Sequence, residues 1–128
     1  MILTIGALFG FIAVAFGAFA EHGLRENISE EHFRFLMTAL RYNQIHAVLI
    51  CGLGIADFST INLLQKRLYK IAKICFITGT ALFSFSIYIS ISCDIPVILY
   101  ATPVGGITLM LAWISLSVSG LQMRADPR

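Results

Sequence analysis

Four apolar stretches, separated by short polar connections, make up most of this 128-residue chain. A bilayer core about 30 Å thick requires roughly 20 helical residues to cross it, and each stretch can be extended to that length. The pattern predicts four membrane-spanning helices, at residues 2–20, 38–61, 71–93 and 97–121. We therefore expect an all-α integral membrane protein, one up-down bundle of four transmembrane helices, with residues 1–128 as a single domain.

The second stretch is the least apolar of the four. Only Tyr42–Ala56 lies between the charges of Arg41 and Asp57, and that segment reaches about 22 Å as a helix. A span over 38–61 is long enough, but it requires Arg41 and Asp57 to reach an interface or to find buried partners.

The connection before this span has a helical pattern of its own. Phe33, Leu36, Met37 and Leu40 repeat at the spacing of one helix face, and the charged residues fall on the other face. This pattern predicts a short amphipathic helix lying at the membrane surface after the first span. The alternative is a plain extension of the second span into water.

The composition excludes an ordinary soluble domain. The chain is 58% hydrophobic and 12% charged, whereas a soluble domain carries about 25% charged residues. A net charge of +2 gives no reason to expect nucleic acid, so membrane lipids are the expected surroundings. Cys51, Cys75 and Cys93 are dispersed and form no CxxC pair, and we expect neither a disulfide framework nor a metal or cofactor.

The placement of the basic residues predicts the orientation. With four spans, six basic residues fall on one side of the membrane: Lys66, Arg67, Lys70, Lys73, Arg124 and Arg128. The positive-inside rule then puts both termini in the cytoplasm. Ala18-Phe19-Ala20 has the form of a signal-peptide cleavage site, but no Lys or Arg precedes the first stretch, so we expect that stretch to remain as a span.

Small residues indicate how the spans pack. Gly6, Gly10, Ala13 and Gly17 share one face of the first span, and membrane helices associate through such close-approach faces. The partner is a neighbouring helix of the same chain or a second protomer, which leaves a homo-oligomer open. In the fourth span the residues expected to shape packing are Pro103, Gly105, Gly106 and Trp113.

Polar residues are expected to gather near the outer end of the bundle. Glu21 and His22 end the first span on the side where the second begins, and Gly23 allows a sharp turn between them. Ionisable groups at this depth usually face protein rather than lipid. The predicted polar cluster comprises Glu21, His22, Thr38, Tyr42, His46, Ser84 and Tyr88.

Four motifs, in order, carry a family resemblance: GAFAEHGL from Gly17, TALRYNQIHA from Thr38, GTALFSFSIY from Gly79, and TPVGG from Thr102, followed by Trp113. Together they resemble the YgdD-like family of small bacterial inner-membrane proteins, a domain of unknown function with a related small mitochondrial transmembrane protein. The resemblance implies four transmembrane helices and no established activity. It also implies a bacterial inner-membrane location, or a mitochondrial one as the alternative.

The family's characteristic positions fall here on Gly17, His22, Gly23, Thr38, Ala39, Tyr42, His46, Ser84, Tyr88, Pro103, Gly105, Gly106 and Trp113. The chain departs from the family at two positions. Glu21 replaces a small residue and adds a charge, and Phe85 replaces a glycine, which puts close packing of the third span in doubt.

These observations favour a non-enzymatic membrane protein that associates with membrane proteins or lipids. The histidines lack an HxxxH or HExxH spacing, so a structural hydrogen-bond network is favoured over a metal site, with a proton-handling role as a further alternative. No serine has an evident base and acid partner for catalysis. Two other functions stay open: permeation or proton-coupled transport of a small solute, and a role as accessory subunit of a respiratory membrane complex.

Overall fold

The computed structural model describes residues 1–57 and 63–125, with side chains given outside 63–66 and 123–125. The described residues are helical apart from short connections, and they include no strand, which confirms the all-α class. The helices are α1 (Ile2–Phe19), α2 (Glu30–Ala56), α3 (Leu63–Thr80), α4 (Ser86–Cys93) and α5 (Ala101–Ala125).

Three short helical segments extend these helices. A π-helical turn at Ala20–Leu24 lengthens α1, and a second at Ala81–Phe85 joins α3 to α4 into one rod. A 3-10 turn at Pro96–Tyr100 leads into α5, where the fixed φ of Pro96 suits a first helical position. The reversal before it depends on Asp94, the non-glycine residue with positive φ, at 54°.

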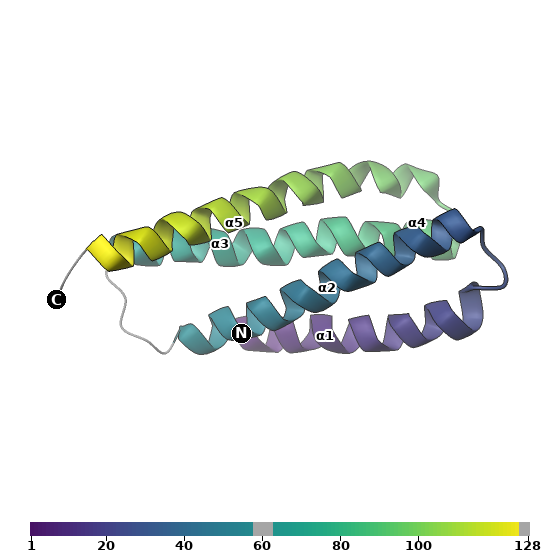
Figure 1. Ribbon diagram of the computed structural model, residues 1–128, viewed down its shortest axis with the longest axis horizontal. Helices are drawn as coiled ribbons and strands as arrows, with labels where there is room; N and C mark the ends of the chain where they lie inside the picture. The colour runs from purple at the N-terminus through teal and green to yellow at the C-terminus, as the bar shows by residue number, and fades with distance from the viewer. Residues whose placement is uncertain (58–62, 126–128) are drawn as a thin grey trace.

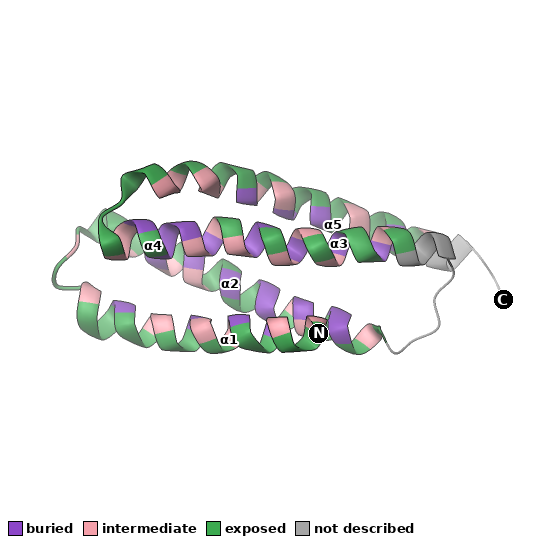
Figure 2. Ribbon diagram, turned by 180° about the vertical axis from the view of Figure 1, so that it is seen from behind, coloured by how far each residue is buried: buried purple, intermediate pink, exposed green. Residues whose placement is uncertain are grey.

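The four rods, α1, α2, α3 with α4, and α5, alternate in direction, and the start of α1 and the end of α5 lie toward the same end of the bundle (Figure 1). Packing is most extensive between α1 and α2 and between α3 and α5, so the fold is built from two helical hairpins. The hairpins meet where α2 lies against α3, α4 and the π-helical turn between them. The buried residues follow that junction (Figure 2).

Glycines bring the backbones of each hairpin into contact. A Cβ atom added at Gly54 would lie 2.5 Å from the backbone nitrogen of Leu3, and one added at Gly105 would lie 2.4 Å from that of Phe83. Gly6 meets Cys51 in the same way. The small-residue face of the first span therefore packs on α2 of its own chain. Of the two partners expected from the sequence, a neighbouring helix and a second protomer, the structure shows the first.

Three helical segments in the described chain are long and apolar enough to cross a membrane: Ile2–Leu24, Arg67–Cys93 and Pro96–Gln122. Large apolar side chains stand exposed along α1 and α5, as expected of faces that contact lipid rather than water. α2 is long enough but is not one of the three, since its middle carries Arg41, Asn43, Gln44 and His46.

The structure corrects two sequence expectations about the first connection. The predicted surface helix does not stand apart, because residues 30–56 form one unbroken α2 with no proline or bend between the polar turns and the apolar ones. Gly23 is not the site of a sharp turn either, since it continues the helix inside Ala20–Leu24. The observed extension is the alternative that the sequence left open.

The helix bounds differ from the predicted spans mainly at their ends. The helix predicted at 38–61 begins earlier, at Glu30, and its predicted last residues, 58–61, lie outside the described residues. Asp57 has found a partner, Lys73 of α3, with which it forms an ion pair.

The close contact between α1 and α2 gives a prediction that two glycines of α2 can test. Gly54→Ala inserts a methyl group against the backbone of Leu3, whereas a Cβ atom at Gly52 meets nothing within 4 Å. We expect Gly54→Ala to lower the free energy of unfolding by about 1–3 kcal/mol and Gly52→Ala to leave it nearly unchanged. Denaturant titration in micelles measures both, and equal stability of the two variants contradicts the packing described here.

Candidate functional site

Buried polar side chains gather where the two hairpins meet. Asn43 on α2 is fully buried, and its Nδ2 donates to the hydroxyl of Tyr88 on α4 at 3.3 Å. Ser84, in the π-helical turn, donates to the backbone carbonyl of Ala39 at 2.9 Å. These two bonds tie α2 to the α3–α4 rod by polar contacts in an otherwise apolar interior.

Aromatic rings surround His46 in the same layer. Its side chain is 2% exposed, and its ring centroid lies 5.7 Å from that of Phe76 and 6.2 Å from that of Trp113. Tyr42 lies 5.9 Å away on the same helix. Tyr42 and Trp113 are themselves 43% and 45% exposed, so they form a cover between His46 and the surroundings.

Several buried polar atoms at this junction have no hydrogen-bond partner in the described part of the chain. They include Asn43 Oδ1, His46 Nδ1 and Thr80 Oγ1. An unpaired buried polar group costs about 1–3 kcal/mol, and native proteins leave few of them.

The structure brings together only some of the residues predicted to form one cluster. His46, Ser84 and Tyr88 are buried at the junction, whereas Glu21 and His22 are exposed. Glu21 forms an ion pair with Arg25 on its own helical segment.

The register of α1 and α2 explains why His22 lies apart. Gly17 faces Leu40, and Gly54 faces Leu3, so residue numbers fall along one helix as they rise along the other. Continued outward, this register puts His22 level with Phe35, about 10 Å along the axis from Tyr42. Thr38 is likewise exposed, and its hydroxyl donates to the carbonyl of Arg34, one turn back, at 3.0 Å.

Asn43 is the polar residue that the sequence interpretation missed. Of the cluster residues predicted on this helix, Thr38 and Tyr42 lie on the exposed face of α2, and His46 is the one that is buried. The buried face instead repeats with steps of three and four, through Leu36, Ala39, Asn43, His46, Ile50 and Leu53. That heptad-like pattern is visible in the sequence and would have found Asn43.

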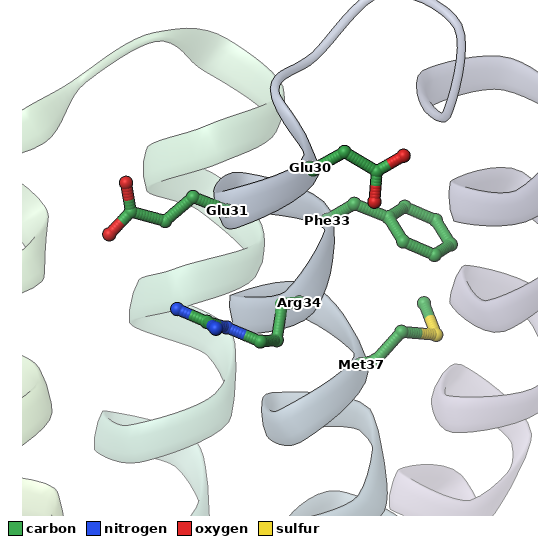
Figure 3. A pocket seen from close by; sticks show the side chains of 5 residues that line it. All are labelled: Glu30, Glu31, Phe33, Arg34 and Met37. Carbon is green, nitrogen blue, oxygen red and sulfur yellow. The ribbon is translucent and has the colours of Figure 1, made fainter.

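A second feature lies at the bundle end where α2 begins. An open hollow of about 680 Å³ is lined by Glu30, Glu31, Phe33, Arg34 and Met37. Figure 3 shows Phe33 and Met37 directed to one side of α2 and Glu31 and Arg34 to the other. Ser29 caps the helix here, accepting a bond from the backbone nitrogen of His32 at 3.2 Å. The hollow offers both signs of charge beside apolar side chains.

Near the same bundle end, an apolar groove of about 420 Å³ runs between α1 and α4. Its lining residues are Ile12, Phe16, Phe19, Phe85, Tyr88, Ile89, Ser92 and Cys93. Phe85, where the resemblance implies a glycine, packs edge to face with Phe9 of α1, with 5.1 Å between ring centroids. Within residues 1–57 and 63–125, no three His, Cys, Asp or Glu side chains come close enough to hold a metal ion.

An all-helical fold with three apolar, bilayer-length segments and lipid-suited outer faces defines a helical membrane protein. The protein belongs to the DUF423 family of proteins of unknown function, whose model matches residues 16–106. This result confirms the family resemblance found in the sequence.

Bacterial relatives cover nearly the whole chain. The UPF0382 membrane protein of Haemophilus influenzae is 29% identical, covering 96% of this chain and 95% of its own length. The UPF0382 inner membrane protein YgdD of Escherichia coli is 29% identical, with 95% and 90% covered. The UPF0382 membrane protein YwdK of Bacillus subtilis is also 29% identical, with 94% and 95% covered. No solved structure matches the chain significantly.

The Asn43–Tyr88 bond gives a stability prediction. Tyr88→Phe removes the hydroxyl that accepts from Asn43 and leaves the buried amide without that partner. We expect a loss of about 0.6–1.7 kcal/mol in the free energy of unfolding, the range for hydrogen bonds between membrane helices. Tyr100→Phe is the control, because Tyr100 is 81% exposed. A Tyr88→Phe loss no larger than that of the control would show that the bond contributes nothing.

Proposed function

We propose that this protein is a non-enzymatic, four-span inner-membrane protein that associates with membrane phospholipids at the bundle end where α2 begins. The observation that carries the proposal is the hollow of Glu30, Glu31, Phe33, Arg34 and Met37 (Figure 3). It lies beyond the most apolar part of the rods, at the level expected for lipid headgroups.

The chemistry of the hollow suits a zwitterionic headgroup. The Arg34 guanidinium matches a phosphate, and the carboxylates of Glu30 and Glu31 match an ammonium group. None of the three forms an ion pair with another residue in the described chain. Phe33 and Met37 supply apolar contact for the glycerol and upper acyl region, and the α1–α4 groove has the character that an acyl chain requires.

Permeation of a solute or proton receives less support. The unpaired atoms around His46 provide polarity in the interior, but Tyr42, Phe76 and Trp113 close over that ring. A transporter is expected to keep a substrate site open to one side near the midplane. Lipid association needs no such opening.

The proposed orientation has both termini in the cytoplasm. α2 counts as the fourth span because its Asp57 is neutralised by Lys73 and its buried face is apolar apart from Asn43 and His46. α3 begins at the bundle end where α1 begins and α5 ends (Figure 1), and from its second turn on it carries Arg67, Lys70 and Lys73. The hollow then faces the extracytoplasmic side.

Paired variants test lipid association. Glu31→Gln with Arg34→Gln removes one charge of each sign from the hollow without changing the net charge. Glu26→Gln with Arg67→Gln is the control, since both residues are exposed and lie outside the hollow. After reconstitution in phosphatidylethanolamine and phosphatidylglycerol, native mass spectrometry measures the phospholipid retained. We expect the hollow variant to retain about fivefold less, equivalent to about 1 kcal/mol of binding, and the control to match the wild type.

Equal retention by all three proteins would refute the proposal.

Reporter fusions test the orientation separately. A reporter fused after Arg128 is expected to read cytoplasmic, and one inserted after Asn27, in the α1–α2 connection, is expected to read extracytoplasmic. The prediction fails if both positions report the same side, because α1 and the remaining spans then cannot alternate as proposed.

A further inference from the structure

The unpaired polar atoms at the hairpin junction lie in one layer. Ser84 faces Ala39 through a hydrogen bond, and Phe76 faces His46 through their rings. α2 and α3 run in opposite directions, so this register brings Thr80 opposite Asn43. Asn43 and His46 are three residues apart and share one helix face. The three residues that carry unpaired atoms are therefore neighbours in the contact between α2 and α3.

The hydrogen bonds that these three unpaired atoms can still form indicate which ligand could bind between the helices. Asn43 Nδ2 is used by Tyr88, so its Oδ1 needs a donor. The hydroxyl of Thr80 needs an acceptor, and an unprotonated His46 Nδ1 needs a second donor. A single water molecule supplies two donors and one acceptor. Buried waters typically make about three such bonds to groups that are otherwise unsatisfied.

Charge decides against a cation in this layer. No Asp or Glu occurs in α2 between Glu31 and Asp57, and none occurs from Leu63 to Cys93. A cation here would be an uncompensated charge in a bilayer-deep interior, which is far more costly than a neutral ligand.

We propose that one water molecule is bound between α2 and α3, donating to Asn43 Oδ1 and His46 Nδ1 and accepting from the Thr80 hydroxyl. It links the two hairpins at the middle of the bundle and continues the Tyr88–Asn43 bond as far as His46. It also requires His46 to carry its proton on Nε2. The site is separate from the hollow at the end of α2 and does not depend on the proposed lipid association.

The stability of a Thr80→Val variant distinguishes an occupied site from an empty one. If the water is bound, the valine removes one of its bonds, and we expect the melting temperature to fall by about 4 °C. If the site is empty, the same change removes an unpaired buried hydroxyl, and the melting temperature should stay constant or rise. Thr78→Val is the matched control, because the Thr78 hydroxyl is exposed and bonds to Ile74 on its own helix.

A second measurement does not depend on the stability of any variant. The ¹⁵N chemical shifts of His46 in the wild-type protein report which ring nitrogen is protonated, and cross-relaxation between water and the Asn43 side-chain amide reports a long-lived water. We expect the Nε2–H form together with a water signal. His46 lies against the backbone carbonyl of Tyr42, but its Nδ1 lacks the geometry of a hydrogen bond to that oxygen. A proton on Nδ1 that is donated to this carbonyl would overturn the proposal, as would a Thr80→Val melting temperature no lower than that of Thr78→Val.

Discussion

Backbone contact at glycine is the interaction on which the rest of this structure depends. Lipid tails are as apolar as leucine, so helices in a bilayer gain little by burying apolar side chains against each other. Gly6 and Gly54 let α1 and α2 approach until backbone meets backbone, and Gly79 and Gly105 do the same for α3 and α5. Each hairpin is thereby closely packed by contacts within itself, independently of its contact with the other hairpin.

The junction between the hairpins is held differently. Hydrogen bonds hold it instead: Asn43 of α2 donates to Tyr88, and Ser84 donates to the backbone carbonyl of Ala39 on α2. A polar residue at a core position costs stability, but it specifies one register because a shifted register leaves it unpaired. The π-helical turn at Ala81–Phe85 contributes by presenting Ser84 to α2 while Gly105 packs against its other side.

The two ends of the bundle differ in chemistry. At the end with the chain termini, Lys73 pairs with Asp57, and Tyr69 donates to the carbonyl of Leu53 at 2.5 Å, so α2 is fastened to α3. At the opposite end, Glu30, Glu31 and Arg34 of α2 line an open hollow and form no ion pair with any other residue that the structure describes. α2 is thus bonded to α3 at one end of the bundle and presents an open polar surface at the other. This arrangement is expected if the second end meets lipid headgroups.

By itself, the sequence determined the class of the protein, its family and the face by which its first span packs. Those properties follow from local composition and from periodicity within one helix, as with Gly6, Gly10 and Gly17. Which polar residues meet was decided only in the tertiary structure, because it depends on the register between helices. The register between α1 and α2 keeps His22 away from Tyr42, and the register between α2 and α4 joins Asn43 to Tyr88. No single helix encodes a register, since it arises from where two backbones come closest.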